Sequence, residues 1–237
     1  MDNKKNNEKT LNRERETSMA GAGFQTASDV AYRIISQKIL NGEFPPGMKL
    51  SRRKMADATG VSVIPVIEAL KRLEDDRLVE SKPQWGSFVT VPTLDKIRQS
   101  YQLREAIECQ SARYLSEHMT AEQEAVLWAL ATELDTVPYN ENTVLNTSDT
   151  HLNFHTRLTE FTGNSLLVDT LRKINLFWIL CKGTGSRAPG CQYPRYWHRL
   201  LVDKIKEGDP QTAEDAMRIH VNDSLLAIEA TWNEGTK

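Results

Sequence analysis

Apolar and polar positions follow two different patterns along this chain, and the change falls near residue 91. Before it, apolar side chains recur with the helical period of about 3.6 residues in three short segments, which a pair of apolar strands follows. Three short helices and a hairpin in this order are typical of a winged helix-turn-helix, a module that places one helix in a DNA groove. The expected helices are residues 28–40, the segment between Ser51 and Gly60, and residues 62–75; the expected strands are residues 78–81 and 87–91.

From Pro92 onward the apolar spacing is helical throughout. The fold class expected is therefore mainly α: an N-terminal winged helix-turn-helix followed by an all-helical antiparallel bundle. We divide the chain into a disordered arm (residues 1–25), a DNA-binding domain (26–91) and a helical domain (92–237). The helices expected in the last domain are residues 93–118, 120–134, 148–162, 165–181, 193–207 and 210–232, with residues 137–147 as a loop.

Charge and cysteine content indicate which partners and which cellular compartment to expect. Residues 28–91 carry ten Lys and Arg against eight Asp and Glu, and residues 92–237 carry fifteen against twenty. A net +2 is weak for a surface that neutralises phosphates, and dimerisation would double it. Three isolated cysteines, the lack of a secretory signal and the lack of a membrane-length apolar run favour a cytoplasmic protein that does not bind membranes.

Short motifs along both domains resemble those of the GntR family of bacterial transcription regulators, in the FadR-like branch with an all-helical FCD effector domain. The resemblance implies a homodimer that binds a double-stranded DNA operator and a small organic-acid or sugar-acid effector, and it implies no enzyme activity. The motifs are Ile39-Leu-Asn-Gly42, Pro46-Gly47, Gly60-Val-Ser62, Glu68-Ala-Leu70, Gly86-x-x-Val89, Arg104-x-x-x-Glu108, Phe154-His155, Gly163-Asn164, His198, Gly208-Asp209 and His220.

The expected DNA contacts depart from the family at the helix that reads bases. The family places arginines where this chain has Val63 and Ile67, which removes two guanine readers. Arg53 matches the family's basic residue in the preceding helix. The candidate DNA-binding residues are Arg52, Arg53, Lys54, Ser62, Val63, Ile64, Ile67, Lys71 and Gly86.

Four of the five histidines fall at positions that a metal site requires. His151 and His155 are one helical turn apart, and His198 and His220 lie ten residues before and twelve after Gly208. These separations are roughly 15 and 18 Å along two antiparallel helices, so the two side chains lie nearly level. A single histidine on a buried face is by default a hydrogen-bonded core residue, whereas several that converge favour a metal.

The resemblance assigns three metal ligands, His155, His198 and His220. The family's fourth ligand is usually an aspartate, and its position here is His151. Replacing a carboxylate by an imidazole favours a borderline divalent metal, Zn²⁺ or Ni²⁺ first, over Mn²⁺.

Arg104, Glu108 and Asn164 are the candidate effector-binding residues. Arg104 is suited to hold an effector carboxylate by a bidentate contact. The alternative for Arg104 and Glu108 is an ion pair on the protein surface, four residues apart on one helix.

Two other functions stay open. One is a ligand sensor that has lost sequence-specific DNA binding, which Val63 and Ile67 suggest. The other is a metal-dependent enzyme, against which we find no general base or nucleophile motif.

Overall fold

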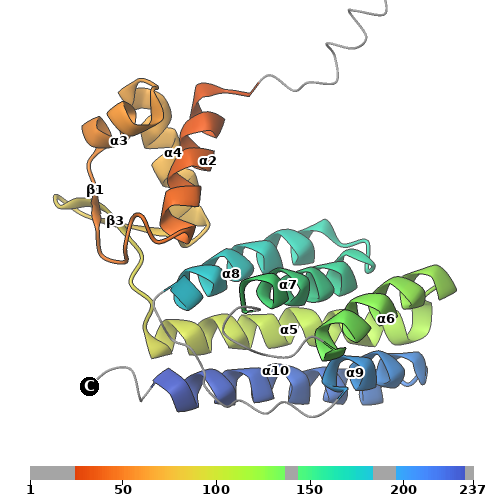
Figure 1. Ribbon diagram of the computed structural model, residues 1–237. Coiled ribbons are helices and arrows are strands. Elements are labelled where there is room, and N and C mark those ends of the chain that lie inside the picture. Colours follow the sequence, from red (N-terminus) through yellow and green to blue (C-terminus); the bar gives the residue numbers. More distant parts are fainter. Residues whose placement is uncertain (1–24, 137–143, 184–195, 233–237) are drawn as a thin grey trace, which may run out of the picture.

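The computed structural model describes residues 25–136, 144–183 and 196–232, and Figure 1 shows two units joined at one corner. Residues 1–24, which make up nearly all of the expected arm, lie outside the described residues. The helices expected up to residue 75 and the two expected strands are present, and the fold class is confirmed: a small winged helix-turn-helix precedes an all-helical bundle.

The first unit consists of three helices and a three-stranded antiparallel sheet. Its order is α2 (Ala27–Leu40), β1 (Lys49–Leu50), α3 (Arg52–Thr59), α4 (Val63–Asp75), β2 (Val79–Lys82) and β3 (Gly86–Val89). Within the sheet β3 lies between β1 and β2, with Lys49 opposite Phe88 and Val79 opposite Val89. Strand β1 was not predicted, because two residues carry no measurable alternation of apolar and polar positions.

Local hydrogen bonds fix where the first helices begin and end. Thr26 and Asp29 form a capping box, in which the Asp29 N–H donates to Thr26 Oγ1 at 3.1 Å, so α2 begins one residue before the expected start. Gly60 adopts φ +72° and ends α3, a left-handed conformation that favours glycine. The chain can therefore turn at once into α4, whose buried side carries Val66, Leu70 and Leu73.

The second unit is a bundle of α5 (Leu94–His118), α6 (Ala121–Thr136), α7 (Val144–Glu160), α8 (Ser165–Gly183), α9 (Trp197–Lys206) and α10 (Pro210–Trp232). The long helices α5 and α10 lie side by side and antiparallel (Figure 1). No helix within the described ranges combines the length and apolar character that a membrane span requires.

Two expected helix starts in the bundle were wrong by four residues. Helix α7 begins at Val144 and not at residue 148, so the end of the expected loop is helical. Helix α9 begins at Trp197 and not at residue 193. Tyr196 has φ +66°, a conformation outside the right-handed helix, and residues 184–195 lie outside the described ranges.

The two units meet where β3 leads into α5. Lys96 Nζ, in the first turn of α5, contacts the Glu80 carboxylate of β2 and donates to the Val91 carbonyl at 2.9 Å. Lys173 of α8 lies 4.0 Å from Asp76, next to the end of α4. Helices α5 and α8 therefore support the winged helix-turn-helix from below in the view of Figure 1.

Candidate metal centre

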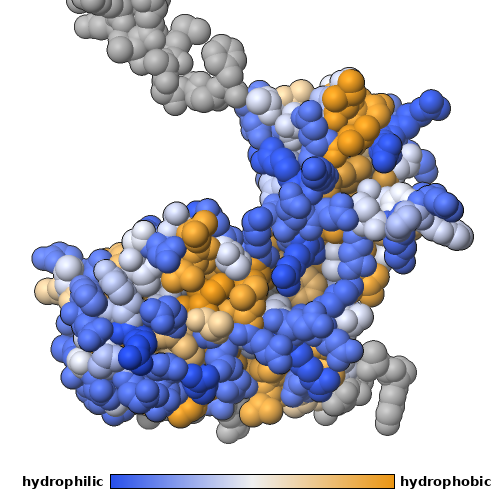
Figure 2. Space-filling view, turned by 180° about the vertical axis from the view of Figure 1, so that it is seen from behind, coloured by the Kyte–Doolittle hydropathy of each residue, from blue (hydrophilic) through white to orange (hydrophobic). Residues whose placement is uncertain are grey.

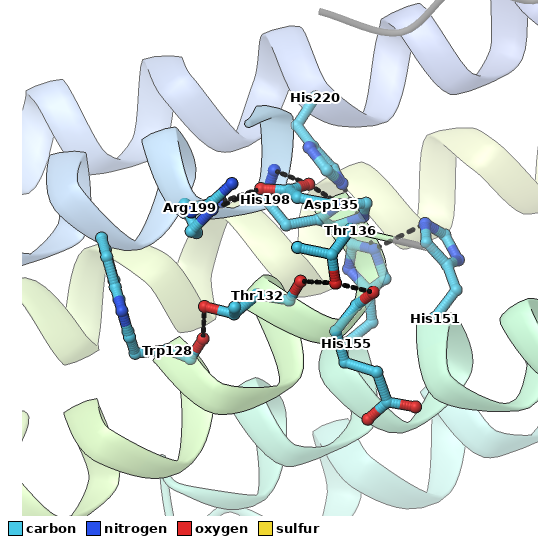
Figure 3. A network of polar contacts seen from close by, with 10 residues as sticks. Trp128, Thr132, Asp135, Thr136, His151, His155, His198, Arg199 and His220 are labelled. Atoms are coloured by element: carbon cyan, nitrogen blue, oxygen red, sulfur yellow. Dashed lines mark hydrogen bonds and ion pairs between the residues drawn. The ribbon is translucent and has the colours of Figure 1, made fainter. Parts of the chain in front are cut away.

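Four histidine side chains from three helices meet inside the bundle (Figure 3). His151 and His155 come from α7, His198 from α9 and His220 from α10, and one nitrogen of each lies within 4.8 Å of those of the others. The Nε2 atom of His155 is 3.2 Å from Nε2 of His151 and 3.3 Å from Nε2 of His220. His151 is half-buried and the other three are buried.

Two local features bring these histidines together. A four-residue spacing puts His151 and His155 on one face of α7. Gly208, with φ +81°, reverses the chain between α9 and α10, and Asp209 caps α10 by accepting from the Thr212 N–H at 2.9 Å. The two helices then run antiparallel, which leaves His198 and His220 level, with ring centroids 4.9 Å apart.

Glu108 of α5 orients the His155 ring. Its Oε2 atom lies 2.5 Å from His155 Nδ1, and its Oε1 atom accepts from Arg104 Nε at 2.6 Å. Burial alone would favour the neutral acid, but the charge of Arg104 and the contact with His155 outweigh it and lower the pKa of Glu108 to about 2. A carboxylate at Nδ1 holds the proton there and leaves Nε2 with its lone pair toward the other histidines.

Asp135, at the end of α6, orients the His198 ring in the same way. Its Oδ1 atom lies 3.0 Å from His198 Nδ1, and its two oxygens also accept from the backbone N–H groups of His198 and Arg199. Burial opposes ionisation of Asp135, yet these hydrogen bonds lower its pKa below the ordinary value. The sequence did not reveal this residue, because the expected helix ended at Leu134.

The histidine cluster fits a divalent metal. A tetrahedral ion with bonds of about 2.0–2.1 Å holds neighbouring nitrogens roughly 3.3 Å apart, and the two Nε2 separations are 3.2 and 3.3 Å. The Nε2 atom of His198 is buried without a hydrogen-bond partner among the described residues. Carboxylates behind the ligating rings are the usual outer shell of such a site.

The protonation states also fit. Burial lowers the pKa of His155 to about 4, against the raising effect of Glu108, and burial lowers the pKa values of His151 and His220 well below 6.5. These three imidazoles are therefore neutral near pH 7, which is the form that ligates metals.

The structure places the three expected effector contacts in different surroundings. The surface alternative for Arg104 and Glu108 is wrong, because their side chains are 1% and 0% exposed. Glu108 has both oxygens occupied by Arg104 and His155 and so faces no free space for an effector. Asn164 lies on the surface, where its Oδ1 atom accepts from the Leu166 N–H at 3.1 Å and caps α8.

Arg104 keeps one group available. Its Nη2 atom is buried and has no hydrogen-bond partner within the described ranges, and its guanidinium lies 5.2 Å from the Tyr101 ring centre. A buried donor without an acceptor is unfavourable. An anion that entered next to the cluster would satisfy it.

All nine candidate DNA-binding residues are exposed on the winged helix-turn-helix. The basic ones, Arg52, Arg53, Lys54 and Lys71, form no ion pair with any residue of the described ranges. By contrast, Arg72 is held by Asp29 at 2.6 Å and lies 4.5 Å over the Tyr32 ring. The unpaired cations remain available for phosphates.

We expect Glu108→Gln to destabilise the protein by about 3–5 kcal/mol, because it leaves buried Arg104 without a counter-charge. The control is Glu105→Gln on the same helix, which breaks a more exposed ion pair with Arg218 and should change stability by less than about 1 kcal/mol.

The difference should also depend on pH, as followed by urea unfolding. The pKa of Glu108 is about 2 in the folded protein, against an ordinary value of 4.5. Its contribution is therefore complete above about pH 5 and decreases as the pH falls toward 2. Equal stabilities of the two variants at pH 7 would contradict this account.

Two family comparisons cover most of the described chain. Residues 27–89 match the bacterial regulatory proteins of the gntR family, and residues 99–223 match the FCD domain. YdhC, an HTH-type transcriptional regulator of Bacillus subtilis (strain 168), is 24% identical over 212 residues, which cover 86% of this chain and 92% of YdhC. The repressor NanR of Salmonella newport (strain SL254) is 27% identical over 231 residues, which cover 87% of this chain and 85% of NanR.

Solved structures show the same fold. A GntR regulator from Rhodococcus sp. RHA1 has a TM-score of 0.65 at 22% identity, over 86% of this chain and 97% of that one. Escherichia coli McbR/YncC has a TM-score of 0.67 at 16% identity, over 87% and 99%. The matched families and relatives are transcription regulators and not enzymes. The chain belongs to the GntR family of bacterial regulatory proteins, in the branch with an FCD domain, and is a DNA-binding transcription regulator.

Proposed function

We propose that this regulator senses a small organic or sugar acid through a divalent metal held by His151, His155, His198 and His220. The observation that carries the proposal is the convergence of four imidazoles in a buried cluster, two of them fixed from behind by carboxylates. A polar core network without a ligand would satisfy its buried nitrogens internally, whereas here His198 Nε2 has no partner among the described residues.

The four histidines would hold the metal, which would supply a Lewis acid for an oxygen of the effector. The chain supplies the rest of the site. Asp135 and Glu108 hold the tautomers of two ligands, and Arg104, which is paired with Glu108, has a buried Nη2 atom without a hydrogen-bond partner in the described ranges. An acid with two oxygens spaced to meet both the metal and the guanidinium would satisfy both, which selects carboxylates over neutral sugars.

We expect about one Zn²⁺ or Ni²⁺ ion per chain in protein purified without chelator or nickel resin, measured by elemental analysis. His155→Ala should lower the metal content and the unfolding midpoint together, because it removes a central ligand. His118→Ala is the matched control, since His118 is exposed and stacks on Tyr114 at 4.3 Å, outside the cluster. His151→Asp should keep the site and shift it toward Mn²⁺. Less than a tenth of a metal ion per chain, unchanged by added Zn²⁺ or Ni²⁺, would contradict the proposal that these histidines bind a metal.

The effector is testable by thermal shift. We expect an organic or sugar acid to raise the unfolding midpoint of metal-loaded protein, because a ligand that binds only the folded state stabilises it. After chelation the same acid should give little shift. Arg104→Lys keeps the charge and loses the planar pair of donors, so it should reduce the shift while metal content stays constant. An equal shift with and without metal would show that the acid binds elsewhere.

We further propose that the protein is a homodimer through its helical domain, because one module with a net +2 makes few phosphate contacts. The outer faces of α9 and α10 carry three exposed apolar side chains, Leu200, Ile219 and Leu226, which suit a partner copy.

Light scattering at micromolar concentration should give the mass of a dimer. Ile219→Asp should shift the mass toward the monomer, because it puts a charge into the apolar contact. Leu166→Asp is the control, as Leu166 is 76% exposed on α8. A monomeric wild-type protein with specific DNA binding intact would rule out the dimer. If only Leu166→Asp dissociated the dimer, the interface would lie on α8 and not on α9 and α10.

A further inference from the structure

The outward side of α4 begins with an apolar surface. Val63, Ile64 and Ile67 are 40%, 70% and 40% exposed, and we call them together the α4 apolar face. Figure 2 shows hydrophobic residues gathered on the outer part of the winged helix-turn-helix, next to hydrophilic ones. Single exposed apolar residues need no explanation, but three on adjacent turns of one helix indicate a contact surface.

The first two turns of α4 cannot read a purine by a bidentate hydrogen bond. From Ser62 to Ile67 the only side chain with a donor or acceptor is the Ser62 hydroxyl. Guanine and adenine are read in the major groove by bidentate Arg, Lys, Asn or Gln side chains, and the first two turns of α4 contain none. The next polar residue on this side, Glu68, has no donor.

Helices α3 and α4 also carry exposed cations. Arg52, Arg53 and Lys54 occupy the first turn of α3, and Lys71 lies one turn beyond Ile67 on α4. All four are exposed and form no ion pair within the described ranges. Four unpaired cations outnumber the two exposed carboxylates on this part of the surface, Asp57 and Glu68, and so favour an anionic partner. In a DNA major groove phosphates line the edges and the thymine C5-methyl is the apolar group on the floor.

We infer that the α4 apolar face reads thymine methyl groups, so that the operator presents thymines and not guanines beneath Val63, Ile64 and Ile67. The inference rests on DNA binding by this unit. Thymine methyls gain contact with these side chains, whereas a guanine there would lose water from O6 and N7 without gaining a donor. The DNA sequence is thus selected because thymines fit the apolar side chains and guanines are disfavoured there.

A second copy of the chain suits this face less well. A symmetric dimer places the same patch on both partners. From Arg52 to Lys71, helices α3 and α4 carry four exposed cations against two exposed carboxylates, so two such surfaces in contact would carry net like charge, which repels. Polyanionic DNA brings the opposite charge to the cations on α3 and α4.

The test uses the full-length protein and duplexes that it selects from a random library, at one fixed salt concentration. Each thymine of the selected site is replaced in turn by deoxyuridine, which removes only the C5-methyl. At thymines under α4 the affinity should fall roughly fourfold each, the value of one buried methyl group. Replacement outside the contacts of α4 should change nothing.

Variants assign each methyl to a side chain. Ile64→Ala and Ile67→Ala should each abolish the deoxyuridine effect at one thymine, because the contact is already lost. Both side chains are exposed, so folding should be retained, and circular dichroism checks it. Arg53→Ala should weaken the thymine and deoxyuridine duplexes equally, as expected for a phosphate contact.

Four results overturn the inference. A selected site with guanines under α4, or one insensitive to deoxyuridine, excludes methyl reading while DNA binding stands. No preference for any sequence over random DNA removes specific DNA binding as well. A change of mass by light scattering in Ile64→Ala, with no deoxyuridine effect, assigns the face to self-association.

Discussion

The carboxylate of Glu108 lies at the centre of the helical unit, where it holds two buried partners at once. Arg104 Nε and His155 Nδ1 lie 2.6 and 2.5 Å from its two oxygens, and all three side chains are at most 1% exposed. Such a set is stable only as a whole, since each charge compensates the desolvation of the other. It joins α5 to α7 and fixes the direction of the His155 ring. The geometry of the histidine cluster therefore depends on it.

The same helix connects the cluster to the DNA-binding unit. Arg104 is eight residues from Lys96, or about 12 Å along α5, and Lys96 contacts Glu80 and the Val91 carbonyl beside the wing. A helix is stiff over that length, so a ligand that repositions Arg104 acts on the support of the winged helix-turn-helix. For the proposed sensor, regulation would then require only that the ligand prefers one of two placements of α5, since a ligand shifts an equilibrium by its difference in affinity.

Much of this architecture could be predicted from periodicity, because the helices bury one continuous face each. The four histidines could be placed together for the same reason: i,i+4 spacing on α7 and equal distances from Gly208 are properties of single helices and one turn. The features that the sequence did not predict depend on contacts between distant segments. Asp135 contacts His198, which is 63 residues away in the sequence, and no local sequence pattern predicts this contact. The burial of Arg104 and Glu108 likewise depends on which helices cover α5. The spacing of residues in the sequence does not predict that packing.

In the proposed DNA contact, two helices divide the tasks between them. Phosphate contacts by Arg52, Arg53 and Lys54 add affinity that salt weakens and that does not depend on sequence. Contacts by the α4 apolar face release few counterions and depend on shape and on methyl groups. A chain that lacks guanine readers therefore gains little affinity per half-site, and its discrimination rests on small apolar differences. In the proposed symmetric dimer the two modules would multiply such differences, which makes weak reading by each α4 compatible with a specific operator.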